Sequence, residues 1–177
     1  ITPGSWKLTE DSLKKTLSEV FEKNPKIFPV VIGGEHLITL GVIETLSKVS
    51  VDDKKMTVID FDGHRDLLDE WMGEEHSHIT WAYHAMKTGK FDMVQIGCRV
   101  YDEIEQERLK EFGIKTSLDE FAENETENKD RPIYITVDLD VLDPSFAPEV
   151  GTQQSEGMTF DELLKELDKL KGKNIIG

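Results

Sequence analysis

The sequence has only one cysteine, Cys98, and far fewer basic than acidic residues. A single cysteine excludes an internal disulfide and fits a reducing compartment, so we expect a cytoplasmic protein. The 21 Lys and Arg residues against 36 Asp and Glu give a formal net charge of −15, which argues against nucleic acid or an anionic membrane as a partner. No apolar run reaches membrane-spanning length, so we expect no membrane insertion.

Apolar stretches of two kinds alternate along the 177 residues. Short, continuous apolar runs predict buried strands, and stripes at helical spacing predict amphipathic helices. We expect a first helix with Thr9 as its N-cap, which stops before Pro25. We expect strands over residues 28–32, 56–59, 91–97 and 133–140, short strands at 114–116 and 174–177, and helices over 37–49, 79–88, 102–112 and 159–171.

This alternation predicts an α/β fold, a three-layer αβα arrangement around a mostly parallel sheet. In the last helix we expect Leu163, Leu164, Leu167 and Leu170 to face inward. The length allows one domain over residues 1–177. In such sheets ligands bind beyond the carboxyl ends of the strands, where polar residues follow several of the predicted strands.

Metal-binding side chains follow the strand that starts at Met56. Residues two apart in an extended chain point to the same side, so Asp62, His64 and Asp66 converge if the extended geometry continues past the strand end. Burying such charges without partners is costly, and a cation would compensate them. By itself this pattern is equally compatible with a polar loop.

A second strand end carries the same arrangement, with Asp138 and Asp140 two residues apart. Side by side, the two strands would supply four carboxylates and one imidazole, which suits two divalent ions better than one. His36 follows Gly33 and Gly34 at a third strand end. The plain alternative is a histidine at a helix start after an incidental turn. A phosphate-binding turn is possible in principle, but no phosphate-loop pattern follows, and the carboxylate cluster favours His36 as a ligand.

Five segments of the sequence carry a family resemblance: GGEHLIT (33–39), DFDGHRD (60–66), EEHSHITWAYHA (74–85), QIGCR (95–99) and TVDLDVLDPSFAPEVGT (136–152). They resemble the ureohydrolase family of arginases, agmatinases and their relatives, over about residues 28–177. The resemblance implies two Mn²⁺ ions, one held by His36, Asp62, Asp66 and Asp138, the other by Asp62, His64, Asp138 and Asp140. A hydroxide between the ions would attack a guanidinium carbon and release urea and an amine.

The segment Ser77-His78-Ile79-Thr80 is similar to an agmatinase motif, which implies that His78 contacts substrate or relays a proton. Residues 95–99 are also agmatinase-like and place Arg99 near the rim of the site. The resemblance therefore implies the cleavage of agmatine, a small cationic guanidino compound, in a homo-oligomer, a trimer or hexamer. Arginase, guanidinobutyrase and formimidoylglutamase activities, and a metal-binding homologue without catalysis, remain alternatives.

The sequence departs from the family pattern at three places. Gly-Gly-Asp-His-Ser is here Gly33-Gly34-Glu35-His36-Leu37, and Asp-Ala-His is Asp62-Gly63-His64. The loop over 147–154, which borders the substrate pocket in the family, also differs, so it leaves the substrate open. Family chains are longer at both ends, so we expect residues 1–177 to be a single ureohydrolase-type domain that lacks N- and C-terminal segments.

Overall fold

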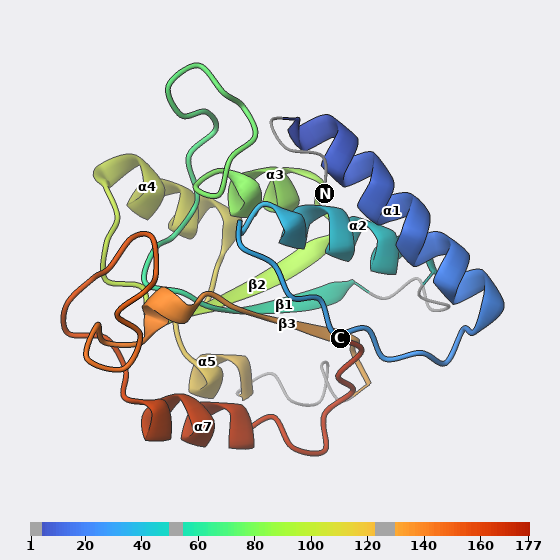
Figure 1. The fold of residues 1–177 in the computed structure, drawn as a ribbon. Helices are drawn as coiled ribbons and strands as arrows, with labels where there is room; N and C mark the ends of the chain where they lie inside the picture. Colours follow the sequence, from blue (N-terminus) through green and yellow to red (C-terminus); the bar gives the residue numbers. More distant parts are fainter. Residues whose placement is uncertain (1–4, 50–54, 123–129) are drawn as a thin grey trace.

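The computed structural model describes residues 5–49, 55–122 and 130–177. Three strands form its sheet: β1 (Met56–Phe61), β2 (Phe91–Ile96) and β3 (Ile133–Val137). The described ranges also contain six α-helices and one short 3₁₀ helix, η1 (Leu139–Val141). The α-helices, labelled in Figure 1, are α1 (Trp6–Lys23), α2 (Ile38–Val49), α3 (Trp81–Lys87), α4 (Glu103–Phe112), α5 (Leu118–Ala122) and α7 (Phe160–Asp168).

The three strands are parallel, in the order β2-β1-β3. Asp60 of β1 lies in register with Gln95 of β2 on one side and Thr136 of β3 on the other. Because neighbouring residues in register point to the same face of a sheet, these three polar side chains form one row across it. The parallel order also places the carboxyl ends of all three strands at one edge.

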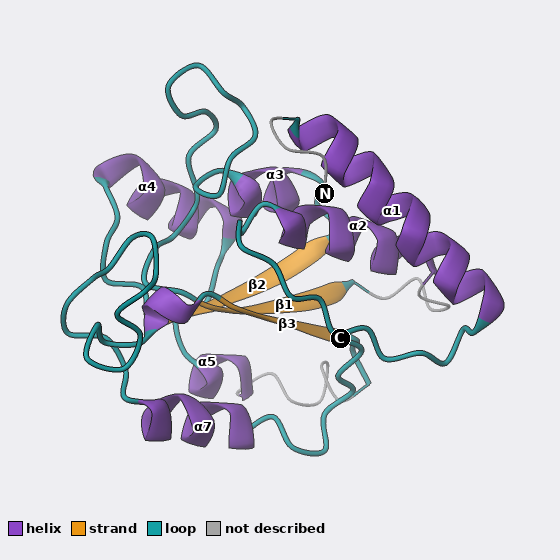
Figure 2. Cartoon of the chain, in the orientation of Figure 1, coloured by secondary structure: helices purple, strands orange, loops and turns teal. Residues whose placement is uncertain are grey.

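Helices cover both faces of the sheet, as Figures 1 and 2 show. One face is covered by α2, α3 and α4, with α1 packed on the outside of α2, and the other by α5 and α7. Two groups of buried apolar side chains correspond to these layers. Val58 of β1 packs in the first group and Ile59 in the second, since successive residues of a strand face opposite sides. The predicted three-layer αβα fold is confirmed.

Side-chain caps fix several helix starts. The Ser5 side chain accepts a hydrogen bond from the backbone N–H of Leu8, so the first helix begins at Trp6. The predicted N-cap, Thr9, is therefore wrong and lies inside the helix. Asp102 and Thr159 form capping boxes with Glu105 and Glu162, each satisfying N–H groups that the helix leaves free.

The strand predicted over residues 28–32 is absent. This segment is extended but is not part of the sheet, and the side chains of Phe28, Val30 and Ile32 are 55%, 76% and 92% exposed. Pro29 has no N–H to give to a strand ladder, and it packs beside Gly177 instead.

Three smaller expectations need adjustment. Residues 114–116 contribute only one bridge, Lys115 to Val94, and residues 174–177 run beside β3 with one bridge, Ile175 to Ile133. Helix α7 ends at Asp168, and Leu164 is 45% exposed and not inward-facing. Within the described ranges, none of the helices is both long and apolar enough to cross a membrane.

Candidate metal centre

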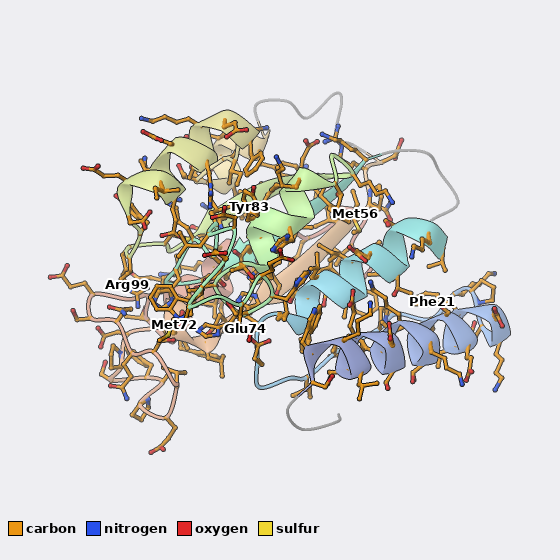
Figure 3. All side chains as sticks on the ribbon, turned by 90° about the horizontal axis from the view of Figure 1, so that it is seen from above. Phe21, Met56, Met72, Glu74, Tyr83 and Arg99 are labelled. Atoms are coloured by element: carbon orange, nitrogen blue, oxygen red, sulfur yellow. The ribbon has the colours of Figure 1, made fainter. Side chains whose placement is uncertain are left out.

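The polar residues after the three strands meet at one edge of the sheet. Met56, at the start of β1, and Arg99, just after β2, lie at opposite ends of the sheet (Figure 3). Asp62 directly follows β1, and Asp138 directly follows β3 and caps the helix η1. His36 reaches the same edge from the turn that precedes α2.

The first group of donor atoms surrounds Nδ1 of His36. This nitrogen lies 2.9 Å from Oδ2 of Asp62, 3.4 Å from Oδ2 of Asp66 and 3.5 Å from Oδ2 of Asp138. Three carboxylate oxygens and one imidazole nitrogen thus converge within a few ångströms. This is the same set of four residues that the sequence resemblance implies for one metal ion.

The second group surrounds Nδ1 of His64. It lies 3.0 Å from Oδ2 of Asp140 and 3.5 Å from Oδ1 of Asp62. Asp62 therefore contributes one oxygen to each group, as a ligand shared between two ions would. Asp62, His64 and Asp140 also satisfy the spacing expected of donors to a single cation.

Unpaired polar atoms support a cation at this edge. Nδ1 of His36 and Oδ2 of Asp62 are buried and make no hydrogen bond within the described ranges, although they are 2.9 Å apart. Buried polar atoms are normally hydrogen-bonded, and such orphans need an explanation. Two potential metal-ligating atoms that lie close together without a hydrogen bond between them fit a metal ion. A set of carboxylates and imidazoles suits a divalent cation.

The electrostatics of the cluster reflect this excess of buried charge. Burial and the charge of Asp62 raise the pKa of Asp66 to about 7. Contacts with Asp140 and Asp62 raise the pKa of His64 to about 10. Against its burial, contacts with Asp62 and Asp66 raise the pKa of His36 well above its usual range. In the metal-free chain, the raised pKa values of these groups favour bound protons, which offset the negative charge of the carboxylates. A bound cation would offset the same charge.

The backbone reaches this arrangement only partly by alternation along a strand. Asp66 has φ 55°, a left-handed conformation that ends the extended geometry, and Asp140 lies in η1. The predicted convergence occurs, but by turns specific to these two positions. Asp66 is held by Trp81, whose Nε1 donates a 2.8 Å hydrogen bond to its Oδ2, and Asp140 Oδ1 accepts from the N–H of Gly63 at 2.9 Å.

Two further predicted residues lie at the border of the cluster. The Arg99 guanidinium donates to backbone carbonyls on both sides of the loop over 143–153, including those of Asp140 at 2.7 Å and Gln154 at 2.8 Å. Arg99 thus fixes this loop beside a candidate ligand. His78 is half exposed, and its Nδ1 lies 3.5 Å from Oε1 of Glu35, the residue before His36.

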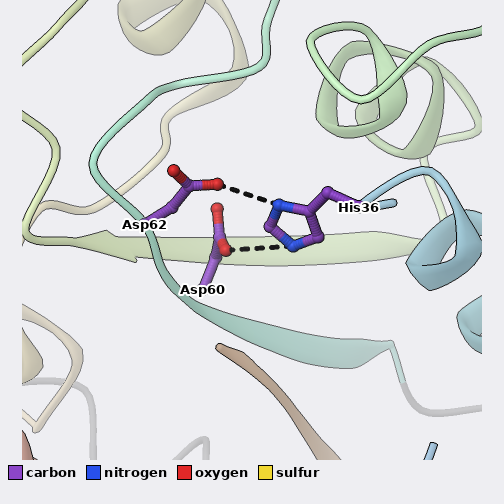
Figure 4. Close-up of side chains that lie close together, drawn as sticks. All are labelled: His36, Asp60 and Asp62. Atoms are coloured by element: carbon purple, nitrogen blue, oxygen red, sulfur yellow. Dashed lines mark ion pairs between the residues drawn. The ribbon is translucent and has the colours of Figure 1, made fainter. Parts of the chain in front are cut away.

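Sequence reasoning missed Asp60. It is fully buried, and its Oδ1 lies 3.8 Å from Nε2 of His36 (Figure 4). Its Oδ2 accepts a 3.1 Å hydrogen bond from Nε2 of Gln95. Burial and the neighbouring Asp62 raise the pKa of Asp60 well above its usual range. The two-residue period that aligns Asp62 with His64 also aligns Asp60 with Asp62, and this signal was available in the sequence.

Comparison with known proteins gives a consistent family. The model of the arginase family matches residues 1–177. The chain is 35% identical over 181 aligned positions to an uncharacterised 32.2 kDa protein of Methanothermus fervidus, covering 98% of this chain and 61% of that protein. It is 34% identical to the agmatinase of Bacillus subtilis, covering 90% of this chain and 55% of the agmatinase.

A crystal structure of a putative agmatinase from Clostridium difficile has the same fold. It matches with a TM-score of 0.83 and 28% identity, covering 99% of this chain and 63% of that one. The chain thus spans about six-tenths of the length of these relatives. The match of the family model, together with the relatives above 30% identity and the shared fold, shows that this chain belongs to the arginase family.

Proposed function

We propose that the whole protein is a Mn²⁺-dependent amidinohydrolase that cleaves agmatine to putrescine and urea. The observation that carries the proposal is the convergence of Asp62, Asp66 and Asp138 on Nδ1 of His36, beside a second group that shares Asp62. The residues that would hold two Mn²⁺ ions are His36, Asp62, His64, Asp66, Asp138 and Asp140. Oxygen and imidazole donors suit this ion.

Two bound ions would supply an activated water as the nucleophile at neutral pH. The residues of this chain would position the ions and orient the guanidinium beside them. Asp66 is also a candidate catalytic residue because its Oδ2 faces the cluster, where it would lie beside the ions and the water that they activate. His78, the second candidate, would accept or donate a proton at the exposed border of the site, where it lies beside Glu35.

A cationic guanidino substrate is consistent with the charge of the chain, since an acidic site attracts a cation. The choice of agmatine rests on two features. The motifs at 77–80 and 95–99 resemble agmatinase segments, and the agmatinase of Bacillus subtilis is 34% identical. A cytoplasmic location and a homo-oligomeric assembly remain predictions.

Urea release by the whole protein, loaded with Mn²⁺, tests the proposal. Agmatine, arginine, guanidinobutyrate and formiminoglutamate are compared, with release of formamide measured for the last. We expect turnover of agmatine with a kcat/KM at least about tenfold above that of arginine, because a pocket that rejects one charged group discriminates at this level. The control is Asp138→Ala, which removes a shared carboxylate and should abolish turnover.

If the wild-type protein and Asp138→Ala were equally inactive on every substrate, the assignment of the protein as a hydrolase would be overturned. A preference for arginine would overturn the substrate assignment but leave the class of reaction. Because the loop over 147–154 differs from the family pattern, it is the segment that an altered preference would implicate first.

A further inference from the structure

The row of polar side chains beneath His36 has no assigned role. Gln95, Asp60 and Thr136 lie in register on three neighbouring strands and are each buried. A carboxylate in the middle of a buried sheet is costly unless it is used. None of the three belongs to the proposed set of ligands.

The two ring nitrogens of His36 face different partners. Nδ1 faces the carboxylates of Asp62, Asp66 and Asp138, while Nε2 lies 3.0 Å from Oγ1 of Thr136 and 3.8 Å from Oδ1 of Asp60. A metal at Nδ1 needs the lone pair of that nitrogen, so the ring proton must sit on Nε2. Nε2–H then donates toward Thr136.

The hydroxyl chain completes this arrangement. If Nε2–H donates to Oγ1 of Thr136, the Thr136 hydroxyl is free to donate to Oγ1 of Thr39, which lies 3.0 Å away. Oδ1 of Asp60 faces the same Nε2 from 3.8 Å, too far for a direct hydrogen bond, and makes no hydrogen bond within the described ranges. A shift of a few tenths of an ångström would make it a second acceptor. A carboxyl group keeps an acceptor oxygen whether it is ionised or neutral.

We propose that Asp60 and Thr136 are positioning residues that hold the proton of His36 on Nε2 and so direct its Nδ1 lone pair at the metal centre. Gln95 holds Asp60 in place through the hydrogen bond to its Oδ2. Partners of this kind fix the orientation of a ligand and its tautomer. The inference rests on the proposed metal centre, but it concerns residues outside the ligand set.

A Mn²⁺ titration of the whole protein tests this proposal without an activity assay. The concentration of free Mn²⁺ is measured by electron paramagnetic resonance. Asp60→Leu and Thr136→Val remove the two acceptors. We expect each substitution to lower the affinity for the more tightly bound Mn²⁺ ion by about 10–100-fold, while two ions still bind at saturation. Asp60→Asn and Thr136→Ser restore an acceptor oxygen and should recover most of the affinity.

Thr57→Val is the matched control. Thr57 lies on the same strand, is equally buried, and points to the face away from His36, and its Oγ1 has no hydrogen bond within the described ranges. The affinity of the Thr57→Val variant for Mn²⁺ should equal that of the wild type. Thermal unfolding of each metal-free variant identifies any that fails to fold.

Conservative variants that bind no better than the apolar ones would overturn the proposal. Saturation of Asp60→Leu with one ion would also overturn it, because Asp60 would then be a ligand itself. Failure of the wild-type protein to bind Mn²⁺ would overturn the metal centre and this inference with it. Absence of urea release with normal Mn²⁺ binding would count against the proposed reaction alone.

Discussion

Nε1 of Trp81 donates a 2.8 Å hydrogen bond to Oδ2 of Asp66, the oxygen that also faces Nδ1 of His36. The indole is fully buried, and its ring centroid lies 4.7 Å from that of His36, with the two rings tilted by 39°. One side chain therefore orients two candidate ligands from different segments. Aromatic packing and a directed N–H together explain why a tryptophan, and not a smaller aromatic residue, occupies this position.

We expect Trp81→Phe to weaken Mn²⁺ binding by about tenfold, because Asp66 loses the donor that orients it. Calorimetric titration measures the change. Trp6→Phe is the control, since Trp6 lies at the start of α1 and stacks on His76, which is not one of the six candidate ligands. An unchanged affinity in Trp81→Phe would show that the hydrogen bond has no part in metal binding.

Affinity for Mn²⁺ should rise with pH. In the metal-free chain, Asp66 has a pKa of about 7 and His64 a pKa of about 10, so both carry protons at pH 6 that the metal must displace. Each proton displaced makes the apparent affinity rise by about tenfold per pH unit below the relevant pKa. Titrations between pH 6 and 8.5 measure this slope, and a flat profile would contradict it.

The metal-free protein should lose stability as pH rises from 5 to 9. The pKa of Asp66 is raised from 3.8 to about 7 and that of His64 from 6.5 to about 10, so the folded chain binds more protons than the unfolded chain in this window. Stability therefore falls as these protons leave. Thermal unfolding in the presence of a chelator measures the trend, and added Mn²⁺ should reverse it.

Replacing Arg99 should loosen the loop that follows β3. Its guanidinium donates to carbonyls near Asp140 and to those of Gln154 and Ser155, which a lysine cannot reach together. We expect Arg99→Lys to raise KM by about tenfold with a smaller effect on kcat. Arg131→Lys, at the ion pair with Asp92, is the control. Faster amide exchange over the loop should accompany the change.

Gly97 should tolerate no side chain. It has φ 92°, and a Cβ would lie 2.4 Å from Cγ2 of Val141. Gly89 has a similar φ of 68° but open space around it. We expect Gly89→Ala to cost about 1–2 kcal/mol from the left-handed backbone alone, and Gly97→Ala about 1–3 kcal/mol more from overpacking. Chemical denaturation of the two variants separates the terms, and equal costs would contradict the steric contribution.

Local sequence signals predicted most of the strands and helices because each carries its own periodicity. The strands β1, β2 and β3 are apolar runs. Asp102 and Thr159 are N-cap residues that mark the starts of helices α4 and α7. The segment at 28–32 shows the limit. Its apolar residues have the composition of a strand, but pairing depends on neighbours that local sequence does not encode.

The candidate ligands were predictable for a similar reason, since Asp62, His64 and Asp138 stand at strand ends. Asp66 and Asp140 are also expected ligands, but their backbone conformations could not be predicted. The left-handed conformation of Asp66 and the 3₁₀ helix at Asp140 depend on turns that tertiary contacts set. The same two-residue period points to Asp60, but a single carboxylate at the end of an apolar run also fits an ordinary strand residue. Only the pairing with Gln95 and Thr136 on the neighbouring strands places Asp60 in a buried polar row.

His36 and Thr136 touch although 100 positions separate them in the chain. The same two segments bring together the candidate ligands His36 and Asp138. The donor set therefore forms only in the folded chain, and the unfolded chain would bind a divalent ion weakly. A ligand that prefers the folded state in this way shifts the folding equilibrium, by about 2.7 kcal/mol at a concentration one hundred times its dissociation constant. A divalent cation bound at this edge would then stabilise the folded state as well as occupy the site.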